Sequence, residues 1–271
     1  MKGDGEDVAQ KAALARGKRP TEDMISHVEA LALARSGRLH DAIPTSAVAV
    51  DMAVRSGRRE RADMFDVASA VWEAFYGNVA AAKQKATHAL ELGRGRDVDY
   101  AAAFALAVAG DITQSRTLAD DLAKNFPEDT SVQSMYLPTL RALFGLNAHD
   151  PAAAIESLQV ASRFDLAPGG IGFNGYYGAL YPLYVRGQAY LAARQPVEAA
   201  AEFQRILDHR SIVLVDPMDA IARLQLARAL ALAGDPVRAK STYNDLLTLW
   251  KNADPDIPVL GQARAEFARL P

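Results

Sequence analysis

The chain has 271 residues, of which 50% are hydrophobic and 23% charged, a composition that supports a buried core and excludes a disordered tail. The formal net charge is −3 and the pI is about 6.0, with acidic and basic residues interspersed, so no cationic surface for nucleic acid or an anionic membrane is expected. Cysteine is absent, which excludes disulfides, thiol catalysis and zinc sites built on thiolates.

The first 20 residues predict one short helix over residues 7–16, which ends at Gly17 and Pro20. No partner helix is evident for it, so we interpret residues 1–20 as the helical remnant of an earlier hairpin. This segment lacks the apolar stretch that a signal peptide needs. No run of about 18 apolar residues occurs in the chain, so no direct membrane insertion is expected.

Residues 21–252 contain six copies of one helical-hairpin pattern, in which a small residue on the first helix is followed 12 positions later by a small residue on the second. The first-helix positions are Ala30, Ala70, Ala103, Ala142, Gly187 and Ala227, and the second-helix positions are Ala42, Ala82, Ser115, Ala154, Ala199 and Ala239. Small residues at both places let facing backbones approach closely, which is the pattern of tetratricopeptide (TPR) repeats. The sequence therefore predicts an all-α fold, a TPR-like α-solenoid of about six antiparallel helical hairpins.

The predicted turns fall seven or eight residues after each first-helix position. Four contain glycine, which suits the left-handed conformation at a helix C-terminus, and the others are Ala148-His149-Asp150 and Arg194-Gln195-Pro196. The spacing between copies varies from 33 residues (Ala70 to Ala103) to 45 (Ala142 to Gly187), against 34 in the standard repeat. We therefore expect an irregular superhelical pitch.

Residues 253–271 are expected to form a C-terminal cap. Pro255 and Pro258 interrupt the preceding helix, and the following segment predicts a short capping helix over the apolar face of the last hairpin. A second irregular segment, the glycine-rich loop at residues 165–178, is too long for an ordinary hairpin turn.

No motif in the sequence predicts catalysis, a cofactor or a metal. Residues 170–175 match GxGxxG formally, but a dinucleotide site needs a strand before the glycines and a helix after them, and here they join two helical hairpins. The five histidines are scattered along the hairpins without the i, i+4 spacing or nearby carboxylates of a metal site. We expect no catalytic residue, no cofactor and no metal ligand.

The concave surface is the predicted binding surface. In TPR solenoids the first helix of each hairpin lines the groove, and the positions around each small residue face it. The candidate groove residues are Tyr100, Phe104, Tyr136, Tyr181, Tyr184, Gln188, Leu224 and Arg228. An aromatic groove suits an extended apolar peptide or a partner helix, whereas the cationic clamps that hold chaperone C-termini are poorly matched. The alternative is that tight winding buries these tyrosines in the core.

The strings FQRILDHR (residues 203–210) and LWKNADPDIP (residues 249–258) are the most specific parts of a family resemblance. Together with neighbouring segments they resemble the TPR-containing C-terminal region of bacterial eukaryotic-like serine/threonine protein kinases, and a similar region occurs behind some winged-helix DNA-binding regulators. The resemblance implies an accessory or sensory module. The kinase motifs VAIK, HRD and DFG are absent from the sequence, so it does not imply catalysis in this chain.

Two functions are therefore expected as alternatives. The first is a non-catalytic protein–protein interaction scaffold with a protein or peptide partner and no nucleic acid. The second is a small-ligand sensor, in which the glycine-rich loop closes over a pocket beside Tyr176, Tyr177 and Tyr181. As an isolated chain the protein is expected in the cytoplasm, or outside it if the chain is the tail of a membrane-anchored kinase.

Overall fold

The computed structural model describes residues 21–167, 175 and 177–271, and this part of the chain contains helices and no strand. The helices pair as α2 (Glu22–Arg35) with α3 (Leu39–Arg55), α4 (Arg59–Tyr76) with α5 (Val79–Leu92), α6 (Arg96–Val108) with α7 (Ile112–Asn125), α8 (Leu137–Asn147) with α9 (Pro151–Ser157), α10 (Tyr181–Ala192) with α11 (Pro196–Asp208), and α13 (Met218–Leu232) with α14 (Pro236–Leu249). Shorter elements are η1 (Val132–Tyr136), η2 (Val160–Phe164) and α12 (Arg210–Val213), and α15 (Pro258–Ala268) is the last helix. The predicted all-α solenoid of about six hairpins with a C-terminal helix is confirmed, while the predicted remnant at residues 1–20 lies outside the described residues.

The small residues of the repeat pattern lie at the helix contacts. All twelve are buried, and the contact within the third hairpin includes a hydrogen bond of 2.7 Å from Ser115 Oγ to the carbonyl oxygen of Ala103. At Gly187 a Cβ atom would lie 2.6 Å from the ring of Phe203, so only glycine fits against this aromatic side chain. The 12-residue spacing therefore gives the correct register of each hairpin.

Replacing Gly187 with alanine is expected to destabilise the protein by about 1–3 kcal/mol, because the new methyl group overlaps the buried ring of Phe203. Gly261→Ala is a suitable control, since nothing lies within 4 Å of a Cβ atom at this exposed site in α15. The control should be neutral or slightly stabilising, because alanine favours helix more than glycine does. Urea unfolding of both variants measures the difference, and equal midpoints would contradict the assigned register.

The turns within the hairpins each contain one residue with a left-handed backbone. In four of them this residue is Gly37, Gly77, Gly110 or Gly234, with φ between 76° and 86°, and in the other two it is His149 or Arg194, each with φ of 59°. Asp150 and Asp235 cap the helices that follow, since each side chain accepts a hydrogen bond of 3.0 Å from the amide three residues later. Turn geometry is thus the same with and without glycine.

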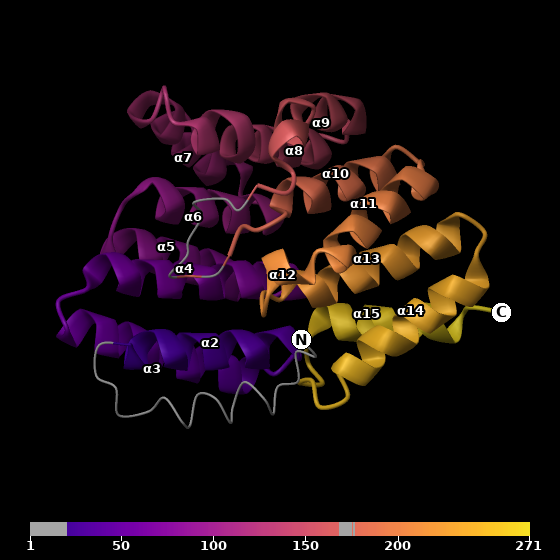
Figure 1. Cartoon of the computed structure of the whole chain (residues 1–271), viewed down its shortest axis with the longest axis horizontal. Coiled ribbons are helices and arrows are strands. Elements are labelled where there is room, and N and C mark those ends of the chain that lie inside the picture. Colours follow the sequence, from indigo (N-terminus) through magenta and orange to yellow (C-terminus); the bar gives the residue numbers. More distant parts are fainter. Residues whose placement is uncertain (1–20, 168–174, 176) are drawn as a thin grey trace.

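The path of the hairpins closes on itself. Figure 1 shows them passing from α2 and α3 at the lower left, through α7 to α9 at the top, and down to α14 and α15 at the lower right, beside the first hairpin. Helix α13 contacts α2 directly, and Arg35 Nε donates a hydrogen bond of 3.0 Å to Asp219 Oδ2. Trp250 Nε1 donates to the carbonyl oxygen of Arg35 at 3.0 Å, and the amide of Asp254 donates to the carbonyl oxygen of Gly37 at 2.9 Å. We call these contacts of the first hairpin with α13 and with the segment that follows α14 the junction.

The first helices of the hairpins face the centre, which side chains fill. In α4 every residue from Val67 to Tyr76 is buried. The ring of Phe75 makes edge-on contacts with Phe104, Tyr181 and Tyr184, at centroid distances of 5.7, 5.4 and 5.5 Å. The centre of the superhelix is therefore an aromatic core.

Candidate functional site

The predicted groove residues lie mainly in this core. Tyr100, Phe104, Tyr136, Tyr181, Tyr184 and Leu224 are at most 7% exposed, whereas Gln188 and Arg228 are partly exposed. The expectation that these side chains line an open wall is corrected by their burial, and the alternative of tight winding describes them. The physical reason is that the first helices pack against one another, so that the ring of Phe75 contacts Phe104 of α6 and both Tyr181 and Tyr184 of α10.

Hydrogen bonds and an ion pair satisfy the polar ends of several of these residues. Tyr136 donates to Asp97 Oδ1 at 2.7 Å, and Tyr184 accepts from Gln188 Nε2 at 2.8 Å. Arg228 pairs with Glu266 of α15 at 2.8 Å, so its guanidinium lies against this last helix. Side chains held in this way position the core, and a partner's contact with Gln188 or Arg228 stays a prediction.

Tyr181 links the core to a buried carboxylate, Asp216. Its hydroxyl donates to Asp216 Oδ2 at 3.3 Å, and the amide of Met218 donates to Oδ1 at 2.8 Å. Burial is the main reason that the pKa of Asp216 rises from 3.8 to about 7, while the two hydrogen bonds lower it in part and the charge of Asp219 raises it.

Asp216→Asn is expected to make the protein more stable at pH 8 by about 1–3 kcal/mol and to have little effect near pH 4. A raised folded pKa means that the folded state binds the proton more tightly, so the wild type loses stability as the pH rises from about 4 to about 7. The amide cannot ionise, so the variant lacks this loss. His27, whose pKa burial lowers to about 4, acts in the opposite direction but is common to both proteins. Urea unfolding at pH 4.5, 6 and 8 tests this, and a difference independent of pH would contradict it.

The described part of the glycine-rich loop makes two buried contacts with the rest of the protein, one from Gly175 to His27 and one from Tyr177 to Asp97. His27 Nε2 donates to the carbonyl oxygen of Gly175 at 3.1 Å, and its ring stacks on Phe65 at 4.2 Å. Tyr177 is 2% exposed and donates to the carbonyl oxygen of Asp97 at 3.1 Å. Residues 168–174 and 176, which include most of the GxGxxG match, lie outside the described residues, so the pocket beside Tyr176, Tyr177 and Tyr181 stays a prediction.

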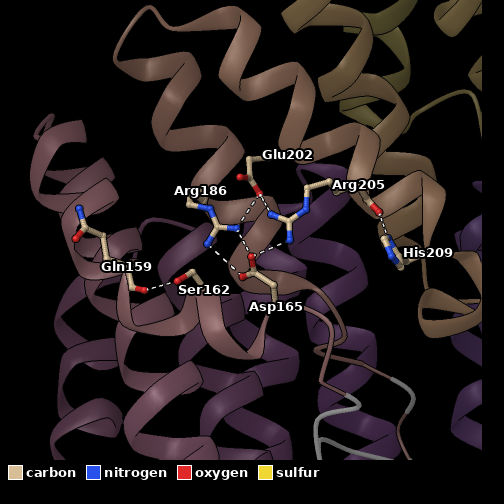
Figure 2. Close-up of polar contacts among 7 residues, drawn as sticks. All are labelled: Gln159, Ser162, Asp165, Arg186, Glu202, Arg205 and His209. Atoms are coloured by element: carbon tan, nitrogen blue, oxygen red, sulfur yellow. Dashed lines mark hydrogen bonds and ion pairs between the residues drawn. The ribbon is translucent and has the colours of Figure 1, made fainter.

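A buried ion cluster fixes the start of this loop (Figure 2). Arg186 of α10 donates to both oxygens of Asp165, at 3.2 and 2.7 Å, and to Glu202 Oε2 of α11 at 2.8 Å. Arg205 completes the cluster at 3.0 Å from Asp165 Oδ2. The Arg186 and Asp165 side chains are only 7% and 5% exposed, so their charges face each other and not solvent. This arrangement joins η2 to the fifth hairpin and is structural.

An open cleft of about 650 Å³ lies beside the junction, where the first two hairpins meet the segment between α14 and α15. It is lined by Leu39, His40, Ile43, Pro44, Glu73, Asn78, Val79, Ala80, Ala81, Asp254, Asp256 and Ile257. We call this hollow the junction cleft. Its walls combine aliphatic side chains with three carboxylates and one imidazole, which makes it the candidate binding site.

The acidic side of the junction cleft comes from the C-terminal segment. Asp254 Oδ2 accepts a hydrogen bond of 2.7 Å from the amide of His40, near the start of α3. The imidazole of His40 has Nε2 3.1 Å from Asp256 Oδ2 and Nδ1 3.6 Å from Asp254 Oδ1. Sequence reasoning missed this site because His40 and Asp254 are 214 residues apart. The string NADPDIP carries both aspartates, but nothing in it indicates which helix they meet.

The described part of the chain holds no group of three or more His, Cys, Asp or Glu side chains arranged for a metal ion. Within the same residues, no helix is both long enough and apolar enough to cross a membrane.

No protein-family model and no curated protein matches the sequence. Among solved structures, the crystal structure of the yeast Tom70 is similar, with a TM-score of 0.49 and 14% sequence identity. The similarity covers 97% of this chain and 58% of that chain, so this chain spans less than two thirds of its length.

Proposed function

We propose that the chain is a non-catalytic protein–protein interaction scaffold that binds a peptide or helical segment of a partner protein in the junction cleft. The supporting observation is that this cleft stays open and mixes apolar walls with charged groups, whereas the aromatic centre is filled. Binding sites of this type bury an apolar anchor and fix its orientation with a few polar groups.

The context we propose is an accessory or sensory module of a bacterial signalling protein. The strings FQRILDHR and LWKNADPDIP support it through their resemblance to kinase-associated TPR regions. The second string includes Trp250, Asp254, Asp256 and Ile257, so the residues behind the resemblance are also residues of the junction and its cleft. We propose residues 21–252 as the solenoid and residues 253–271 as its cap, with the cleft between them.

A site-specific photo-crosslinker tests this function. Placed at Val79, which lines the cleft and is 47% exposed, it should capture a discrete partner from extract of the native cells. Val160 on η2 is 49% exposed and outside the cleft, so it serves as the matched control. The expected result is one protein crosslinked from Val79 and absent from the Val160 sample. Equal capture at both positions, or none at Val79, would contradict the proposal.

A further inference from the structure

We infer that the partner segment carries a lysine or arginine side chain, which enters the junction cleft along its aliphatic wall and pairs with Glu73. The inference rests on the proposed function and names the chemistry of the partner. It is carried by the position of Glu73 in the cleft, by the charges around it and by the apolar side chains that lead to it.

Glu73 is a carboxylate with unused hydrogen-bonding capacity. It is 7% exposed and lines the cleft from the last turn of α4. Oε2 accepts a hydrogen bond of 2.7 Å from Asn78 Nδ2, and Oε1 accepts none from the described residues. Burial is the main reason that its pKa is raised, which indicates that its charge lacks full compensation. A cationic hydrogen-bond donor in the cleft would provide that compensation.

The charges that face the cleft favour a cation over an anion. Helix α3 contributes His40, α4 contributes Glu73, and the C-terminal segment contributes Asp254 and Asp256. Lys85 of α5 acts on Glu73 but is not among the residues that line the cleft. Three carboxylates therefore face one imidazole. An acidic peptide would add repulsion at this site, whereas a basic one would relieve it.

The apolar residues fit the rest of such a side chain. Leu39, Ile43, Val79 and Ile257 border the same hollow, and Val79 is half exposed. Lysine and arginine place their methylene stems on apolar surface and keep the charged end among polar groups. Neighbouring apolar residues of the partner would cover the remaining aliphatic surface. The predicted ligand is thus a peptide with one basic residue flanked by apolar ones.

The test uses displayed peptides. A random 12-residue library is selected against the full chain, and a recovered peptide is synthesised and its affinity measured by calorimetry. We expect recovered sequences to share one lysine or arginine flanked by apolar residues, and Glu73→Gln to weaken binding by tenfold or more. Asp256→Asn at the exposed rim should weaken it two- to threefold, whereas Asp245→Asn, exposed on α14 and outside the cleft, should leave it unchanged.

The controls separate this inference from the function beneath it. Glutamine at position 73 keeps an acceptor for Asn78, so the fold of Glu73→Gln should be retained, and thermal unfolding checks this. If Val79 captures a partner while the recovered peptides lack a basic residue or bind Glu73→Gln unchanged, the inference is wrong and the proposed function stands. If no peptide is recovered and Val79 captures nothing, both are wrong. Spermidine that binds as tightly as the peptide would show a small-cation site and would also overturn the inference.

Discussion

Replacing Arg186 with methionine is expected to destabilise the protein by about 3–5 kcal/mol. The change removes the guanidinium that donates to both oxygens of Asp165 and to Glu202, while leaving those carboxylates in a poorly solvated site. Only Arg205, which is 40% exposed, would remain to compensate them. The cost comes from the unpaired buried charge and not from the lost contacts alone, and urea unfolding at pH 7 measures it.

Two further variants make this prediction sharper. Arg55→Met removes an ion pair with Asp51 in which the side chains are 79% and 66% exposed, and it should change stability by about 0.5 kcal/mol or less. Combining Arg186→Met with Asp165→Asn and Glu202→Gln removes the uncompensated charges and should restore part of the loss. If Arg186→Met alone were no more destabilised than Arg55→Met, the prediction would be wrong, and solvent would have to reach the cluster.

Replacing Trp250 with alanine is expected to cost about 3–5 kcal/mol. This side chain is 1% exposed, packs edge-on against Tyr76 at 5.1 Å and donates its indole hydrogen to the carbonyl oxygen of Arg35. The change removes apolar contacts and leaves a cavity between the first and last hairpins. Hydrogen exchange should therefore increase in α2, α3, α13 and α14 more than in α7 and α8.

Trp250→Phe provides the matched control. Phenylalanine keeps an aromatic ring against Tyr76 but cannot donate to Arg35, so its cost should be well below that of alanine. Exchange that increases uniformly along the chain in Trp250→Ala would contradict a local role at the junction.

The hairpins could be predicted from the sequence because their determinants are local. Each pair of small residues is separated by 12 positions, and each turn within a hairpin contains one left-handed residue, so one short pattern specifies one structural unit. His149 and Arg194 show that this geometry does not require glycine. Repeat spacing and turn position together were sufficient there.

The surface could not be predicted in the same way. Whether Tyr100 or Tyr184 faces solvent depends on how far each hairpin rotates relative to the next, and no short pattern encodes that rotation. Trp250 and Arg35 are 215 residues apart in the sequence. Most contacts in a repeat array join neighbouring repeats, so a pattern within one repeat does not indicate this contact. The groove assignment therefore missed that most of its side chains are buried, and it missed Glu73 and the acidic segment beside it.

The contact of α2 with α13 has a consequence for how the molecule tolerates change. In an open array each repeat touches only its neighbours, so an added or deleted copy merely alters its length, and either end unravels alone. Here the rotations between successive hairpins must together bring the last hairpin back to the first, because Arg35 has to lie within hydrogen-bonding distance of Asp219. An extra hairpin inserted between these two residues would separate them, so the number of copies is constrained by geometry, and the first and last hairpins should unfold together.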